Sequence, residues 1–351
     1  MKSTTGDYFQ ALDHVRALAA FTVFFWHFNT FNDGHLAAPL LFPLSFLTEG
    51  HTGVAIFMTL SGYLFAKLLN RRQIVFIPFL WNRFIRLAPL LFFVICLSGV
   101  VAYINGTFDL GFIKSIVKGV VFPSLPNGGW SITVEAHFYL ILPILLYLSN
   151  HSKLLLLLAL VLPIGLRLIL FMTNGEVQTF AYWTIVGRLD KFVLGIFAFY
   201  ARALYRDKGR YVFIMFICFL LLWYWFDNLG GFFTLPQYPS PSPLWILLPT
   251  VEGFVYSILI AWYEITYTHS ESRLAKFIAL IGTYSYSIYL LHFFFVFKMP
   301  VFINKYLFDI SNPYLMFIFA VPCFLSILPI SYFSYKFIEE PFLKYRKKYY
   351  I

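Results

Sequence analysis

Residues 87–104 read LAPLLFFVICLSGVVAYI, and no charged side chain interrupts them. A helix needs about 20 mainly apolar residues to cross the hydrocarbon core of a bilayer, so this stretch predicts a membrane-spanning helix. Similar stretches recur along the whole chain, and we expect ten such helices. Their approximate bounds are residues 11–31, 51–69, 87–104, 134–149, 154–172, 182–200, 211–227, 245–263, 277–297 and 314–335.

The composition excludes a soluble globular protein. Of the 351 residues, 60% are hydrophobic and 22% aromatic, while 12% are charged. Soluble domains carry about 25% charged residues, and such a domain could not cover this much apolar surface. We therefore expect an all-α, polytopic membrane protein. Residues 1–351 are expected to form a single membrane-embedded domain, with no appended soluble domain.

The distribution of basic residues predicts the orientation in the membrane. The chain has 26 Lys and Arg against 16 Asp and Glu, a formal net charge of +10. If the N-terminus is cytoplasmic, 19 of the 26 basic residues fall on the cytoplasmic side and four in outer loops, as the positive-inside rule requires. We expect both termini in the cytoplasm and the chain in the inner (plasma) membrane. The basic charge then reflects topology and contact with membrane lipid, and no nucleic-acid partner is expected.

The cysteines predict no metal site. Cys96, Cys218 and Cys323 each fall inside an apolar run, without CxxC spacing. Neither a zinc site nor a disulfide framework is expected, and no metal cofactor.

Ionisable side chains inside the apolar runs mark the candidate site, because such groups are costly in a membrane and usually line cavities or pathways. Arg16 and His27 are eleven positions apart, so they lie about 20° apart around the helix axis and about 16 Å apart along it. Asp13 lies one turn before Arg16 and can pair with it. The alternative interpretation of His27 is a histidine hydrogen-bonded into a helix packing seam.

Further ionisable residues are predicted in the same outer half of the membrane, on several helices. Ion pairs that lock helices together would account for some of them, whereas a polar cavity open to the outer face accounts for the whole layer. These residues are Glu135, His137, Arg167, Arg188, Asp190, Lys191, Glu252 and His292.

A second feature lies at the predicted cytoplasmic surface. Arg83 and Arg86 are three positions apart and therefore share a helix face. Two guanidinium groups on one face suit bidentate contacts to phosphate groups. The alternative is that they contact anionic lipid headgroups.

Six motifs, spread in order over nearly the whole chain, resemble the acyltransferase-3 family of integral membrane acyltransferases, which O-acylate bacterial surface sugars. The chain departs from the usual family pattern at residues 55–57, where an acidic or polar residue and Phe-Phe are common, and at His137, where Gln is common. The motifs are DHVRALA at 13–19 followed by His27, GVAIFMTLSGYL at 53–64, RFIRLAP at 83–89, WSITVEAHFY at 130–139, YSYSIYLLH at 284–292 and IEEP at 338–341.

The resemblance implies an acyl-CoA donor from the cytoplasm, acetyl-CoA by default, used as a co-substrate. It also implies a carbohydrate or glycolipid acceptor hydroxyl at the outer face, such as O-antigen, capsule or exopolysaccharide. On this basis we expect His27 to be the general base that deprotonates the acceptor hydroxyl. The expected site comprises His27, Arg16 and Glu135 as catalytic residues, Arg83, Arg86 and Ser61 toward the donor, and Trp130, Arg188 and His292 toward the acceptor.

Two questions stay open at the level of sequence. Direct transfer is preferred over an acyl-enzyme, but neither is excluded. A proton-coupled transporter or flippase of a glycan precursor would share intramembrane His, Arg and Glu, although no inverted repeat or pair of Gly/Pro-broken helices is visible. A catalytically inactive scaffold is a third alternative, and the sequence predicts no oligomeric state.

Overall fold

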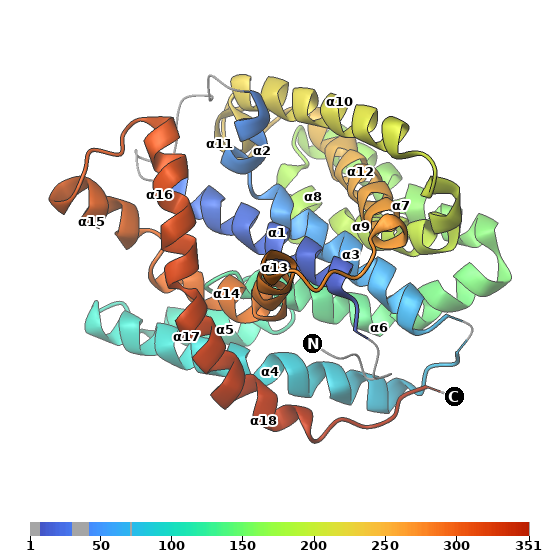
Figure 1. The fold of residues 1–351 in the computed structure, drawn as a ribbon, viewed down its shortest axis with the longest axis horizontal. Helices are drawn as coiled ribbons and strands as arrows, with labels where there is room; N and C mark the ends of the chain where they lie inside the picture. Colours follow the sequence, from blue (N-terminus) through green and yellow to red (C-terminus); the bar gives the residue numbers. More distant parts are fainter. Residues whose placement is uncertain (1–7, 30–41, 71, 351) are drawn as a thin grey trace.

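The computed structural model describes residues 8–29, 42–70 and 72–350, and these ranges are helical, without a strand (Figure 1). The ten predicted apolar runs fall mainly on helices, and residues 30–31 of the first run lie outside the described residues. The helices are α1 (Gln10–Phe28), α2 (Ser45–Thr48), α3 (Thr52–Leu68), α4 (Phe76–Ile104), α5 (Leu110–Gly119), α6 (Gly129–His151), α7 (Lys153–Asn174), α8 (Gln178–Trp183), α9 (Ile185–Ala201), α10 (Gly209–Asn228), α11 (Gly231–Thr234), α12 (Leu244–Thr266), α13 (Arg273–Thr283), α14 (Ser285–Leu291), α15 (Lys298–Tyr306), α16 (Pro313–Ser326), α17 (Leu328–Ser334) and α18 (Glu340–Leu343).

Six segments of the described chain are long and apolar enough to cross a membrane, which fits a multi-pass membrane protein. They are Phe76–Ile104, Gly129–His151, Leu154–Asn174, Gly209–Asn228, Leu244–Thr266 and Pro313–Leu343. Helices α13 and α14 together make a seventh if the bend between them is ignored. The other three predicted spans fall on α1, α3 and α9, and as membrane crossings they stay predictions.

The outer helices carry apolar side chains on their exposed surfaces. Only 22% of the most apolar part of α4 and 17% of that of α7 is buried within the protein. An apolar surface of this extent suits contact with lipid chains. Helices α1 and α3 instead run through the middle of the bundle (Figure 1), where their polar side chains are surrounded by protein.

Two glycines allow α3 and α9 to pack at close range. A Cβ atom added at Gly62 would lie 2.1 Å from the carbonyl oxygen of Phe192, and one added at Gly195 would lie 2.1 Å from that of Thr59. Small residues at such crossings let two backbones approach, as in membrane helix pairs generally. This contact fixes the centre of the bundle, on which the site is built.

The predicted single span at 277–297 is instead two helices, α13 and α14, bent by 54°. The bend comes directly after Gly282, which lies in close contact with α1. A Cβ atom added at Gly282 would lie 1.8 Å from the carbonyl oxygen of Asp13. Helix α14 ends at Leu291, and His292 begins a short 3₁₀ turn. The bend turns α14 so that Tyr286 and Tyr289 line a cavity inside the bundle.

Candidate active site

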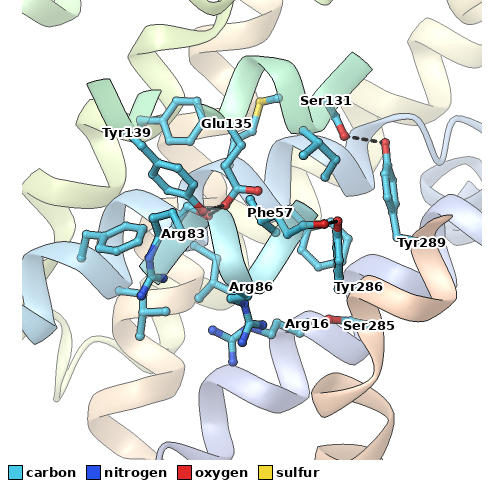
Figure 2. Close-up of a pocket in the computed structure, with 18 of the residues that line it drawn as sticks. Arg16, Phe57, Arg83, Arg86, Ser131, Glu135, Tyr139, Ser285, Tyr286 and Tyr289 are labelled. Atoms are coloured by element: carbon cyan, nitrogen blue, oxygen red, sulfur yellow. Dashed lines mark hydrogen bonds between the residues drawn. The ribbon is translucent and has the colours of Figure 1, made fainter. Parts of the chain in front are cut away.

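A cavity of about 180 Å³ lies among α1, α3, α4, α6, α14 and the C-terminal tail (Figure 2). Five of the sequence-predicted site residues line it: Arg16, Ser61, Arg83, Arg86 and Glu135. Apolar side chains of α3, such as Phe57, Leu60 and Leu64, form much of the remaining wall. The cavity is therefore an apolar chamber with charged groups at defined places, as ligand sites usually are.

Basic side chains gather on one side of this cavity. In Figure 2, Arg16, Arg83 and Arg86 lie below Glu135 and Ser131. Nη1 of Arg16 donates to Oδ1 of Asp13 at 2.5 Å, which confirms the predicted pairing within α1. Arg83 and Arg86 both line the cavity, so the face they share on α4 points inward to the protein rather than only to lipid.

A carboxylate on α6 forms the opposite wall. Oε1 of Glu135 accepts hydrogen bonds from the hydroxyl groups of Tyr139, at 2.5 Å, and Ser61, at 3.2 Å. Two donors on one oxygen hold the carboxyl group in a fixed orientation. Tyr139 was not among the predicted site residues, although it lies one helical turn after Glu135 in the same motif.

Tyr289 closes the end of the cavity away from the arginines. Its hydroxyl group accepts a hydrogen bond from the Ser131 hydroxyl at 2.8 Å and donates to the carbonyl oxygen of Gly128 at 3.2 Å. Its ring lies 6.1 Å, centroid to centroid, from those of Phe57 and His292. Tyr289 thus touches the cavity on one side and a pair of histidines on the other.

That pair is His27 and His292, which do not line the cavity. Nε2 of His292 lies 3.2 Å from Nδ1 of His27. Nδ1 of His27 also lies 2.9 Å from the carbonyl oxygen of Val23, and Nδ1 of His292 lies 3.1 Å from that of Ile288. Since a carbonyl oxygen only accepts, these contacts assign a proton to Nδ1 of both neutral rings.

The assignment fixes what each histidine nitrogen can do. The Nδ1–H group of His27 is shared between the Val23 carbonyl and Nε2 of His292, so the lone pair of His27 is on Nε2. His292 is buried and His27 is half-buried. Aromatic rings surround them: the His27 ring lies 4.5 Å from that of Phe293 and 4.8 Å from that of Trp26.

Two residues predicted to contact the acceptor lie outside the cavity. Arg188 is 1% exposed, and its guanidinium lies over the rings of Tyr182, at 4.1 Å, and Trp130, at 5.4 Å. Its Nε donates to the carbonyl oxygen of Tyr182 at 2.5 Å. Trp130 also packs on Trp183, with ring centroids 4.5 Å apart. In this structure both residues are packing groups next to the cavity wall.

Of the eight ionisable residues expected in one outward-open cavity, only Glu135 lines the cavity described here, and His137 does not. Four others form ion pairs that join helices, which is the alternative the sequence also allowed. Nη2 of Arg167 donates to Asp190 at 2.7 Å, and Nζ of Lys191 donates to Glu252 at 2.5 Å. All four side chains are buried. These ion pairs connect α7 and α12 to α9, because a charge in a dry interior is stable only beside its counter-charge.

One basic residue at the cavity was not singled out from the sequence. Arg346, on the tail after α18, lines the cavity together with Arg83 and Arg86. In the sequence it stands in a run of basic residues that we predicted to be cytoplasmic, and nothing distinguishes it from its neighbours. Within the described residues no group of three or more His, Cys, Asp and Glu side chains could hold a metal ion.

Comparison with known proteins shows the family to which the chain belongs. The model of the acyltransferase-3 family, described as an acyltransferase domain, matches residues 9–336. The chain is 24% identical to O-acetyltransferase OatA of Staphylococcus aureus (strain NCTC 8325 / PS 47), over 96% of this chain and 57% of that protein. A second S. aureus protein (strain COL), provisionally named an O-acetyltransferase, is 23% identical over 96% of this chain and 58% of its own length.

The chain therefore spans less than two thirds of the length of these curated relatives. No solved structure shows a significant match to it. The family match nevertheless covers every motif from Asp13 to His292, and with it Glu135, the histidine pair and all of the cavity lining except Arg346. The chain belongs to the acyltransferase-3 family.

Proposed function

We propose that this protein is a membrane O-acyltransferase that moves an acyl group, most simply acetyl, from cytoplasmic acyl-CoA to a hydroxyl group of a glycan at the outer face of the inner membrane. The observation that carries this proposal is the arrangement along one path: arginines at one end of a cavity, Tyr289 at its other end, and the His27–His292 pair beyond Tyr289. The names of the relatives support transfer of an acetyl group to oxygen.

The donor fits this path by its own chemistry. Coenzyme A carries its phosphate groups at one end and its thioester at the end of a long pantetheine arm. Phosphates at Arg83 and Arg86 would let the arm extend between the apolar side chains of α3 and Glu135. The thioester then approaches Tyr289, where it would come within range of the histidine pair.

Transfer needs a base for the acceptor hydroxyl, and His27 is the side chain best arranged for it. Its Nε2 carries the lone pair, because Nδ1–H is held by the Val23 carbonyl and by His292. As the hydroxyl oxygen attacks the thioester carbonyl, Nε2 takes the hydroxyl proton. The carbon–sulfur bond then breaks, and the proton passes from the imidazolium to the leaving thiolate, which departs as the free thiol of coenzyme A.

The acceptor is expected to approach from the side of the pair that is not buried. The ring of Trp26 lies beside His27 and stacks on Phe233, with centroids 5.8 Å apart and planes 13° apart. Aromatic faces of this kind suit the apolar faces of sugar rings. A carbohydrate or glycolipid is therefore the proposed acceptor class.

The test is thiol release from acetyl-CoA by purified wild type and His27→Ala, with and without extracted surface glycan, together with donor binding on the same samples. We expect glycan-stimulated thiol release in wild type, lost in His27→Ala while donor binding persists. If wild type neither binds nor consumes acetyl-CoA, the proposal is wrong, and a transporter becomes the better interpretation. If His27→Ala keeps full activity, another group is the base.

A further inference from the structure

The C-terminal tail folds back along the first turns of α4. The side chain of Asn82 holds the backbone of Lys347 on both sides, with Nδ2 donating to its carbonyl at 2.6 Å and Oδ1 accepting from its N–H at 2.8 Å. Nε1 of Trp81 donates to the carbonyl of Tyr345 at 3.0 Å. Tyr349 is fully buried against Phe79. The backbone on both sides of residue 346 is thus fixed to α4.

This attachment brings Arg346 to the cavity that Arg83 and Arg86 also line, within range of their charges. Nε of Arg346 and Nε of Arg83 are both buried without a hydrogen-bond partner in the described part of the chain. Neither residue has a carboxylate within ion-pair distance there. Burial and the positive charges of Arg86 and Arg83 lower the pKa of Arg346 to about 10.

Three carboxyl groups of this region accept hydrogen bonds from other side chains. Asp13 accepts from Arg16, Glu135 accepts from Ser61 and Tyr139, and Glu339, which also interacts electrostatically with Arg86, accepts from the Ser287 hydroxyl. Guanidinium groups close to one another repel, and buried donors without acceptors, such as Nε of Arg83 and of Arg346, are costly. An anion with several oxygen atoms would remove both penalties at once.

We propose that Arg346 is a third ligand, with Arg83 and Arg86, for the phosphate groups of the acyl donor, so that the C-terminal tail completes the donor site. The proposal rests on the proposed function. Arg346 lies beyond residues 9–336, which the family model matches, so family membership alone does not imply this role.

Phosphate is the ligand that this geometry favours. Arginine presents a planar fork of N–H donors that matches two phosphate oxygens, and it stays charged when partly buried. Arg83 and Arg86 approach from one helix and Arg346 from the tail. Donors from two separate elements can reach more phosphate oxygens than the donors of one helix face. A lipid headgroup has the same phosphate chemistry, so the experiment must separate the two sources.

The test measures binding of coenzyme A to the full chain in nanodiscs made only of zwitterionic phosphatidylcholine. The variants are Arg346→Gln, Arg346→Lys and the control Lys344→Ala, which removes a charge from an exposed position of the same tail. We expect Arg346→Gln to bind coenzyme A at least about tenfold more weakly, the usual cost of a lost charged hydrogen bond. Arg346→Lys should be intermediate, and Lys344→Ala unchanged. The same affinities are then measured with dephospho-coenzyme A, which lacks the 3′-phosphate. If Arg346 contacts the 3′-phosphate, the loss of affinity in Arg346→Gln should shrink with this ligand. If Arg346 contacts the diphosphate, the loss should persist, and either result supports the proposal.

Wild-type affinity of Arg346→Gln would overturn the proposal, and if Arg83→Gln then still binds weakly, the proposed function stands. If the loss appears only in nanodiscs that contain anionic phosphatidylglycerol, Arg346 holds a lipid phosphate and the proposal is wrong. Absence of coenzyme A binding in wild type contradicts the proposed function itself. If Arg346→Gln unfolds at a lower temperature than Lys344→Ala, the coenzyme A affinities of Arg346→Lys and wild type are compared instead. Lysine keeps the positive charge but lacks the planar fork of donors, so weaker binding by Arg346→Lys supports the proposal and equal binding contradicts it.

Discussion

Nε2 of His292 lies 3.2 Å from Nδ1 of His27, although 265 positions separate the two residues in the chain. The contact joins the end of α1 to the turn after α14. In this contact one ring is the hydrogen-bond donor and the other is the acceptor. His292 accepts from Nδ1–H of His27, and this hydrogen bond orients the ring whose Nε2 carries the lone pair. His292 is thus a positioning residue for the proposed base.

Replacing His292 by Gln should lower kcat and leave the KM for acetyl-CoA unchanged, because the histidine pair lies outside the donor cavity. The fall should be smaller than that of His27→Ala, for which loss of general base catalysis predicts roughly 10² to 10⁴. Steady-state thiol release at saturating glycan measures both constants. Arg83→Gln is the matched control, since it should raise the KM for acetyl-CoA instead. A raised KM in His292→Gln would show that the pair belongs to the donor site.

Replacing Glu135 by Gln tests whether the cavity needs a charge or only an acceptor. The amide oxygen can still accept from Tyr139 and Ser61, so the wall should keep its shape. If the negative charge balances the arginines or the reacting groups, transfer should fall by at least about tenfold with little change in the unfolding temperature. Ser61→Ala, which removes one neutral hydrogen bond from the same oxygen, is the control and should change activity much less. Equal effects of the two variants would mean that hydrogen bonding alone matters.

Replacing Asp190 by Ala should destabilise the protein strongly. It leaves the guanidinium of Arg167, which is fully buried, without its counter-charge. Breaking a buried ion pair in this way typically costs about 3–5 kcal/mol. Thermal unfolding in detergent measures the effect. Glu340→Ala breaks the half-exposed pair with Lys336 and should cost at most about 1 kcal/mol; a similar loss in both variants would refute a structural role for the buried pair.

The sequence predicted those features that depend on local composition or on helix periodicity. Apolar runs predicted where the long helices lie, although not the count of membrane spans, and the spacing of Asp13 and Arg16 predicted their ion pair. The shared face of Arg83 and Arg86 followed from the same periodicity. Each of these properties is decided within a few turns of one helix.

Features that depend on contacts between distant segments were not predicted. The bend after Gly282 arises where that residue meets the backbone of Asp13 on another helix. Arg346 lies at the cavity because contacts of Asn82, Trp81 and Phe79 hold the tail against α4. Likewise, the sequence placed Arg167 and Asp190 in one layer, but whether they line a cavity or pair with one another depends on how α7 and α9 pack.

Replacing Gly195 by Ala tests the helix crossing on which the site is built. The new Cβ would lie 2.1 Å from the carbonyl oxygen of Thr59 and 2.8 Å from the backbone nitrogen of Tyr63, so α3 and α9 must separate. Overpacking of this kind usually costs about 1–3 kcal/mol. Because Ser61 lies on α3 between these contacts and donates to Glu135, we also expect weaker donor binding.

Gly165→Ala is the control. Gly165 lies within α7, and a Cβ atom added there meets nothing within 4 Å. Alanine is also the better helix former, so the stability of this variant should stay equal or rise. Unfolding temperature and coenzyme A affinity, measured on both variants, check the prediction, and equal values for Gly195→Ala and wild type would mean that the crossing tolerates a wider spacing than the structure has.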